Sequence, residues 1–314
     1  MVTKKNTQKS ENGLSSAGHR LGQIVGDWWE TQVIYPLLLE VAASLNLYLD
    51  NRVMQRDCRS AKVQWADAEG NIVDYDYVLE IGGTKKIKGV PVAFLESFWR
   101  GGARHSKDKA RDDANKLLPM RGTYATARFL AIAACGEFTE PARDYVRSRG
   151  IDLFFVSKSN IINSFAQLGL EIDYVDSLPE VSKNKLVQNL QEKFTETKQI
   201  QAATLLRQVA GESAFAAFKQ KIIASLCATP QEIRIYVLQK SEPAIFKTLA
   251  EASAFLNSKK PAFIPTIDVE QYEYEVVFSD GSEFGRSLST LAKVIETNTQ
   301  LSILVTHMQS IKQS

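Results

Sequence analysis

Two acidic side chains, Asp76 and Glu96, give the strongest chemical signal in the sequence. Asp76 precedes an apolar run, and Glu96 lies twenty residues later within the next apolar run. If these runs are neighbouring strands, the two carboxylates can share one divalent cation. Mg²⁺ prefers oxygen ligands and keeps several waters, so a carboxylate pair and a substrate phosphate satisfy it. Such an ion activates a bound water and offsets charge on a phosphodiester during hydrolysis.

The pattern around these acids predicts the strands that position them. Residues 61–65 and 72–81 alternate as a β-hairpin does, with a Glu-Gly-Asn turn between them, and residues 90–100 predict a third strand. In a regular strand, the side chain of Glu96 lies between two phenylalanines on one face. A carboxylate seldom lies there without a partner, which favours a metal site.

Simpler explanations stay open for both acids. Arg100 follows Phe98 by two residues and lies on the same strand face as Glu96. An ion pair with Arg100 would therefore also explain a carboxylate at position 96. Asp76 and its neighbour Asp74 are residue types that hairpins favour in any case.

A basic segment follows the third strand and begins a helix that we predict from Ser106, as its cap, to Leu118, with Pro119 ending it. Its seven positive and three negative side chains give a local charge of +4, although a solvated helix would carry many of the same charges. Basic clusters bind phosphate backbones. The positive side chains are Arg100, Arg104, Lys107, Lys109, Arg111, Lys116 and Arg121.

Three passages resemble the PD-(D/E)xK nuclease superfamily, which includes restriction endonucleases and Mrr-like nucleases. The opening segment Gly26-Asp27-Trp28-Trp29-Glu30 is similar to the family's first helix with its glutamate. Asp76-Tyr77-Val78-Leu79 and then Glu96 are similar to its two strand acids. The passage from Phe129 through Phe138-Thr139 to Leu153 is similar to the strands and helix that close the Mrr-like core. The likeness covers roughly residues 22–168.

The resemblance implies an α/β fold, a restriction-endonuclease-like mixed β-sheet flanked by helices, and Mg²⁺ held by Asp76 and Glu96. It also implies that Glu30 supports the metal or its water. The family places a lysine two residues after the second acid, and Phe98 stands there. Either another cation takes its role or the site is catalytically inactive; for the first case we expect Arg100 and Lys107, with Lys109 ranked just below Lys107.

For DNA contacts we expect three residues of the basic segment. Arg104 and Lys109 would engage the phosphate backbone, and His105 is more naturally a phosphate contact or surface histidine than a catalytic base.

Composition limits the remaining possibilities. The 314 residues are 44% apolar and 24% charged with a net charge of +2, as in folded globular proteins. No apolar run is long enough for a membrane span, and we expect a cytoplasmic protein. We divide the chain into a disordered tail (1–18), a nuclease-like core (19–180), and a C-terminal helical and α+β region (181–314) for DNA recognition or dimerisation.

The leading hypothesis is therefore a Mg²⁺-dependent, type II-like restriction endonuclease that cleaves double-stranded DNA as a homodimer. Two alternatives remain: a nuclease-fold module that binds DNA without cutting it, for which Phe98 is the main argument, and a structure-specific repair nuclease.

Overall fold

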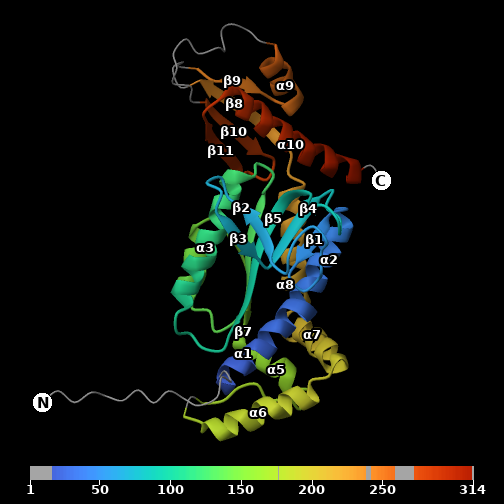
Figure 1. The fold of residues 1–314 in the computed structure, drawn as a ribbon, viewed down its shortest axis with the longest axis vertical. Coiled ribbons are helices and arrows are strands. Elements are labelled where there is room, and N and C mark those ends of the chain that lie inside the picture. The colour runs from blue at the N-terminus through green and yellow to red at the C-terminus, as the bar shows by residue number, and fades with distance from the viewer. Residues whose placement is uncertain (1–15, 176, 238–241, 259–271, 313–314) are drawn as a thin grey trace, which may run out of the picture.

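The computed structural model describes residues 16–175, 177–237, 242–258 and 272–312 and contains a mixed sheet of five strands flanked by helices. This confirms the predicted α/β class. The strands lie in the order β1-β4-β5-β6-β7, with β5 at the centre (Figure 1). Their bounds are β1 Tyr48–Asn51, β4 Tyr77–Ile81, β5 Val90–Arg100, β6 Phe129–Gly136 and β7 Asp152–Ser157.

Parallel pairing is confined to one half of this sheet. Strands β5, β6 and β7 pair in parallel. Helices α3 (Ser106–Thr123) and α4 (Glu140–Ser148) connect them on one face, while α5 (Lys158–Ala166) packs with the core of the other face. Because helices cover both faces, every residue of β6 is buried, which explains its continuous apolar sequence.

The opening helical segment is interrupted before Pro36. Helix α1 (Ala17–Trp28) continues into a π-helical segment, η1 (Trp29–Ile34), and α2 (Tyr35–Ser44) follows. Pro36 lies in the first turn of α2, where no backbone N–H is needed, so it does not break the helix there. The irregular segment carries Glu30.

Residues 1–15 of the expected tail lie outside the described residues. The helix already begins at Ala17, because the Ser16 hydroxyl accepts a hydrogen bond from the His19 backbone N–H and caps α1.

The hairpin of β2 (Val63–Ala66) and β3 (Ile72–Tyr75) is confirmed, but the second strand expected over residues 72–81 is divided at Asp76, and its later half is β4 of the five-stranded sheet. Residues 180–226 form three helices, α6 (Glu180–Lys193), α7 (Glu196–Ala210) and α8 (Glu212–Leu226). Their apolar side chains join the same core as α1 and β5, so the packed core continues past residue 180.

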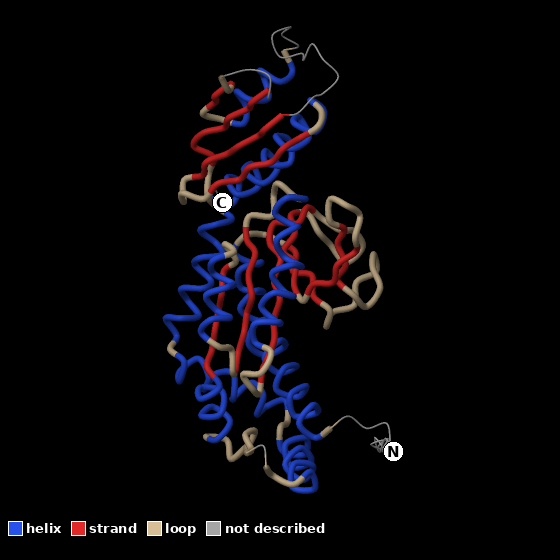
Figure 2. The backbone as a smooth tube through the Cα atoms, turned by 90° about the vertical axis from the view of Figure 1, so that its left-hand side faces the viewer, coloured by secondary structure: helices blue, strands red, loops and turns tan. Residues whose placement is uncertain are grey.

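The C-terminal part has a separate antiparallel sheet in the order β11-β10-β8-β9, with helices α9 and α10 against it (Figure 2). The strands are β8 Pro230–Val237, β9 Ala244–Phe246, β10 Tyr272–Phe278 and β11 Glu283–Leu288, and the helices are α9 Leu249–Asn257 and α10 Leu291–Lys312. No described helix combines the length and apolarity that crossing a membrane requires.

Helix α3 differs from its prediction at both ends. The residue before it is His105, in the left-handed region at φ 61°, and the Ser106 hydroxyl donates to the carbonyls of Ala103 and Glu137 rather than capping the helix. Pro119 lies inside the helix instead of ending it. The following Met120 is fully buried, and its packing favours another turn despite the lost hydrogen bond.

Candidate active site

The two strand acids occupy adjacent positions across β4 and β5. These strands are antiparallel, and Tyr77 pairs with Leu95, so Asp76 and Glu96 form the next rung. The Asp76 carboxylate accepts a hydrogen bond from the Ser97 backbone N–H at 2.7 Å, which fixes it against β5. Both acids are buried, with 8% of Asp76 and 2% of Glu96 exposed.

A lysine from α3 completes this pair. The Lys116 Nζ lies 3.0 Å from Glu96 Oε2 and forms an ion pair with it. Burial opposes the charged form of Lys116, but the combined attraction of Glu96, Asp113 and Asp76 outweighs burial and raises the lysine pKa. The ammonium group therefore stays protonated, which suits charge stabilisation and not the role of a base.

The surroundings of Glu96 disfavour the ionised form of its carboxyl group. Burial, and then the nearby Asp76 and Asp113 carboxylates, raise its pKa to about 8, although Lys116 acts in the opposite direction. Its Oε1 atom is buried and has no hydrogen-bond partner among the described residues. A buried carboxylate oxygen without a donor is costly, so the site gains by binding a proton or a cation there.

Glu30 approaches the same acids from η1. Its pKa is raised to about 7, first by burial and then by Asp76. Arg52 connects the two carboxylates: its Nη2 lies 2.6 Å from Glu30 Oε1 and 3.1 Å from Asp76 Oδ1. The Tyr77 hydroxyl donates to the Glu30 backbone carbonyl at 2.7 Å and ties the irregular helix to β4.

A second pair from α3 borders Glu96. Lys109 Nζ lies 2.7 Å from Oδ1 of the fully buried Asp113, whose Oδ2 has no partner in the described part of the chain. The same ammonium group lies 5.0 Å from the ring centre of Phe98. The helix thus places a cation over the Phe98 ring, at the position where the nuclease resemblance would call for a lysine.

Asp76, Arg52 and Lys116 open onto a pocket of about 310 Å³ between α3, the β2–β3 hairpin and the loop after β1. Three cations line it, Arg52, Lys62 and Lys116, together with Asp74 and Asp76. Lys62 pairs with Asp74 at 2.7 Å and leaves two-thirds of its side chain exposed. A pocket of this charge admits a phosphate group next to the buried acids.

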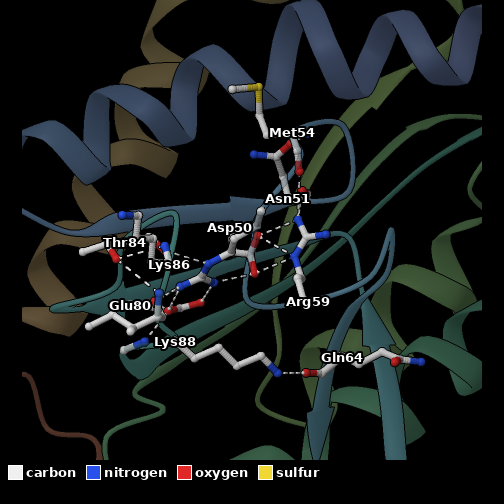
Figure 3. A network of polar contacts seen from close by, with 12 residues as sticks. Asp50, Asn51, Met54, Arg59, Gln64, Glu80, Thr84, Lys86 and Lys88 are labelled. Atoms are coloured by element: carbon white, nitrogen blue, oxygen red, sulfur yellow. Dashed lines mark hydrogen bonds and ion pairs between the residues drawn. The ribbon is translucent and has the colours of Figure 1, made fainter.

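The loop that carries Arg52 is anchored by two further arginines (Figure 3). Arg56, fully buried in its side chain, pairs with Asp50 of β1 at 2.7 Å and Glu80 of β4 at 2.5 Å. Arg59 pairs with Asp50 and donates to the carbonyls of Asn51 and Met54. This network holds residues 51–60 against the sheet and so fixes the base of Arg52.

The other expected cations do not reach the acids. Arg100 donates to the carbonyl of Arg104, and Lys107 is exposed and forms no ion pair with a described residue. Arg104 is exposed as well, and His105 pairs with Asp108 at 3.1 Å on the surface. Arg100 ends β5, Arg104 and His105 precede α3, and Lys107 in its first turn lies about 14 Å along the helix from Lys116.

The acidic side chains suit Mg²⁺ in their chemistry, but few of them lie close enough together to hold an ion. Among the described residues no group of three or more His, Cys, Asp or Glu side chains is arranged to hold a metal ion. The Asp76 and Glu96 pair, with one unpartnered oxygen, matches an ion that takes one or two carboxylates and completes its shell with water and substrate phosphate.

No protein-family model, curated protein or solved structure matches this chain. The site is therefore argued from its own geometry.

Sequence reasoning grouped Lys116 with the basic segment but did not assign it to the acids, and it did not single out Arg52 or Asp113. One signal was present: Lys109, Asp113 and Lys116 follow the i, i+4, i+7 spacing of one helix face. That face adjoins the apolar stripe of Ala110, Ala114 and Leu117, which must face the sheet. For Arg52, which lies on a loop, spacing carries no such signal.

Proposed function

We propose that this protein is a Mg²⁺-dependent nuclease that hydrolyses phosphodiester bonds of double-stranded DNA, of the type II-like restriction kind. The observation that supports it most is the juxtaposition of Asp76, Glu96 and Lys116, two buried acids and an ammonium group beside a cation-lined pocket. The restriction-endonuclease-like fold, which the α/β architecture accommodates, is part of the same proposal.

Within this proposal each residue has a distinct task. Asp76 and Glu96 would hold the ion, which when bound supplies a Lewis acid and an activated water. Lys116 keeps Glu96 oriented through its 3.0 Å contact and offsets negative charge that develops on the phosphate. Glu30, with its pKa raised to about 7, is able to exchange a proton near neutral pH.

The DNA contact would extend from the pocket along α3. The exposed Arg104 and His105 lie just before this helix, which rises about 15 Å from Ser106 to Lys116, or about four base-pair steps of B-DNA. Cleavage of both strands of a symmetric site calls for a twofold dimer, so we propose a homodimer. Inside this scheme, the C-terminal sheet and its helices serve recognition or dimer contacts.

Cleavage of plasmid and genomic DNA with Mg²⁺, and separately with EDTA, tests the proposal. We expect discrete fragments with Mg²⁺, none with EDTA, and none from Glu96→Ala. The matched control is Asp112→Asn, which alters an exposed carboxylate of α3 that forms no ion pair with a described residue. Equal cutting by wild type and Glu96→Ala would refute the site.

One observation favours a second function, a DNA-binding module without catalysis. Phe98 replaces the motif lysine, and arginine and lysine side chains already pair with the acids. Retention of DNA in a mobility-shift assay, with no cutting of any substrate under any metal, would favour this module. Preferential cutting of branched or damaged DNA would instead favour a repair nuclease.

A further inference from the structure

Arg52 has an unusual position among the cations of the pocket, because it is the one that bridges two acids from different elements. Its guanidinium contacts Glu30 of η1 at 2.6 Å and Asp76 at 3.1 Å, while half of its side chain remains exposed. Ser97 already donates to the other oxygen of Asp76. The guanidinium thus covers the free oxygen of a proposed metal ligand.

A cation bound by Asp76 and the guanidinium of Arg52 would therefore compete for the same carboxylate oxygen. Arg52 cannot lose its proton to relieve this competition, because guanidinium remains charged in proteins. It must move away when a divalent ion binds. Arg52 lines the pocket together with Lys62 and Lys116, and a phosphate is the anion that fits these three cations. We therefore expect the displaced guanidinium to turn toward a phosphate in the pocket.

The anchoring of the neighbouring loop makes such a movement local. Arg56 and Arg59 hold the backbone on either side of the short turn through Asp50 and Glu80, both buried. The half-exposed side chain of Arg52 can then turn without moving its loop. This arrangement keeps the guanidinium within reach of both the acids and the pocket.

From this geometry we infer that Arg52 is a substrate-binding residue that occupies the carboxylate site in the free protein and transfers to the substrate phosphate when a divalent ion binds. The inference rests on the proposed function, because it requires Asp76 to be a metal ligand. It adds a role that the nuclease resemblance does not assign: metal binding and phosphate binding are coupled through one side chain.

Isothermal titration of the DNA-free protein with Mg²⁺ alone tests the competition directly. Arg52→Gln removes the competing cation, and we expect its Mg²⁺ dissociation constant to fall about tenfold, as for loss of one charge-assisted contact. Arg52→Lys keeps a charge but cannot bridge both carboxylates, so its Mg²⁺ dissociation constant should lie between those of the wild type and Arg52→Gln. Lys62→Gln is the matched control, since Lys62 lines the same pocket but pairs with Asp74, and its affinity should stay within about twofold of wild type.

A second measurement tests the transfer to phosphate. At saturating Mg²⁺, Arg52→Gln should raise the KM for a DNA substrate about tenfold or more, although it binds the metal more tightly. Circular dichroism melting of each variant verifies that it is folded.

The outcomes separate the two claims. If the wild type binds Mg²⁺ and Arg52→Gln binds it with equal or weaker affinity, the inference is overturned but the proposed function is not. Tighter binding together with an unchanged KM would also overturn it, because the guanidinium would then never reach the phosphate. Absence of Mg²⁺ binding in the wild type and in every variant would overturn the proposed function, and the inference with it.

Discussion

Replacement of Lys116 by methionine removes the cation nearest to Glu96 while keeping a side chain of similar length. At 3.0 Å, the pair attracts by about 5.5 kcal/mol for an effective dielectric constant of about 20. Because 38% of the Lys116 side chain is exposed, solvent screening reduces this value, and we take about half as effective. About 2.7 kcal/mol of lost transition-state stabilisation corresponds to about 100-fold in rate.

We expect single-turnover plasmid cleavage at pH 7 to fall about 100-fold in Lys116→Met and less than about twofold in Lys107→Met. Lys107 is the matched control, because it lies on the same helix, is exposed and makes no ion pair with a described residue. Lys116 lowers the pKa of Glu96, so its loss should shift the pH–rate profile upward, with part of the activity recovered above pH 8. The reverse order, with Lys107→Met inactive and Lys116→Met unaffected, would refute the assignment.

Three further predictions concern charge and stability. Ionisation of Glu30 and Glu96 is unfavourable in the fold, with pKa values raised to about 7 and about 8, so the metal-free protein should lose stability by a few kcal/mol as pH rises from about 4.5 to 8. Urea denaturation across this range measures it, and added Mg²⁺ should restore stability at pH 8; a flat profile would contradict the burial argument. Glu96→Gln should abolish cleavage yet raise the melting temperature at pH 8, because the amide carries no charge to bury; lower stability there would count against the raised pKa. Arg56→Met should destabilise the fold by about 3–5 kcal/mol, because Asp50 and Glu80 would stay buried without their partner; a loss under about 1 kcal/mol would show that the network is dispensable.

The sequence predicted most of the elements that hold the acids. Period-two alternation located the β2–β3 hairpin and the full length of β5, and the continuous apolar runs located β6 and β7. It did not predict β1 or the π-helical turn, because a four-residue strand and a single irregular turn have no distinctive period.

The sequence predicted part of the candidate site, and helix packing explains why it did not predict the rest. Glu96 lies on β5 and Asp76 directly precedes β4, so the strand pattern that places Tyr77 opposite Leu95 also brings the two acids close together. The choice among Lys107, Lys109 and Lys116 depends on how α3 is rotated against the sheet. That rotation is set by the packing of Ala110, Ala114 and Leu117 and not by the charges themselves.

The structure weakens the argument that Phe98 leaves the site without a cation. Four carboxylates meet in this region, and three cations already partner them; the acids are Glu30, Asp76, Glu96 and Asp113, and the cations are Arg52, Lys109 and Lys116. Lys109 over the Phe98 ring and Lys116 on Glu96 place two ammonium groups where a lysine at position 98 would have supplied one. A phosphoryl-transfer site requires positive charge at a point in space and is indifferent to the strand or helix that brings it there. With all four acids ionised the cluster carries one excess negative charge, and the unpartnered oxygens of Glu96 and Asp113 then call for a further cation, which is why we argue for a metal ion and against a site closed by its own side chains.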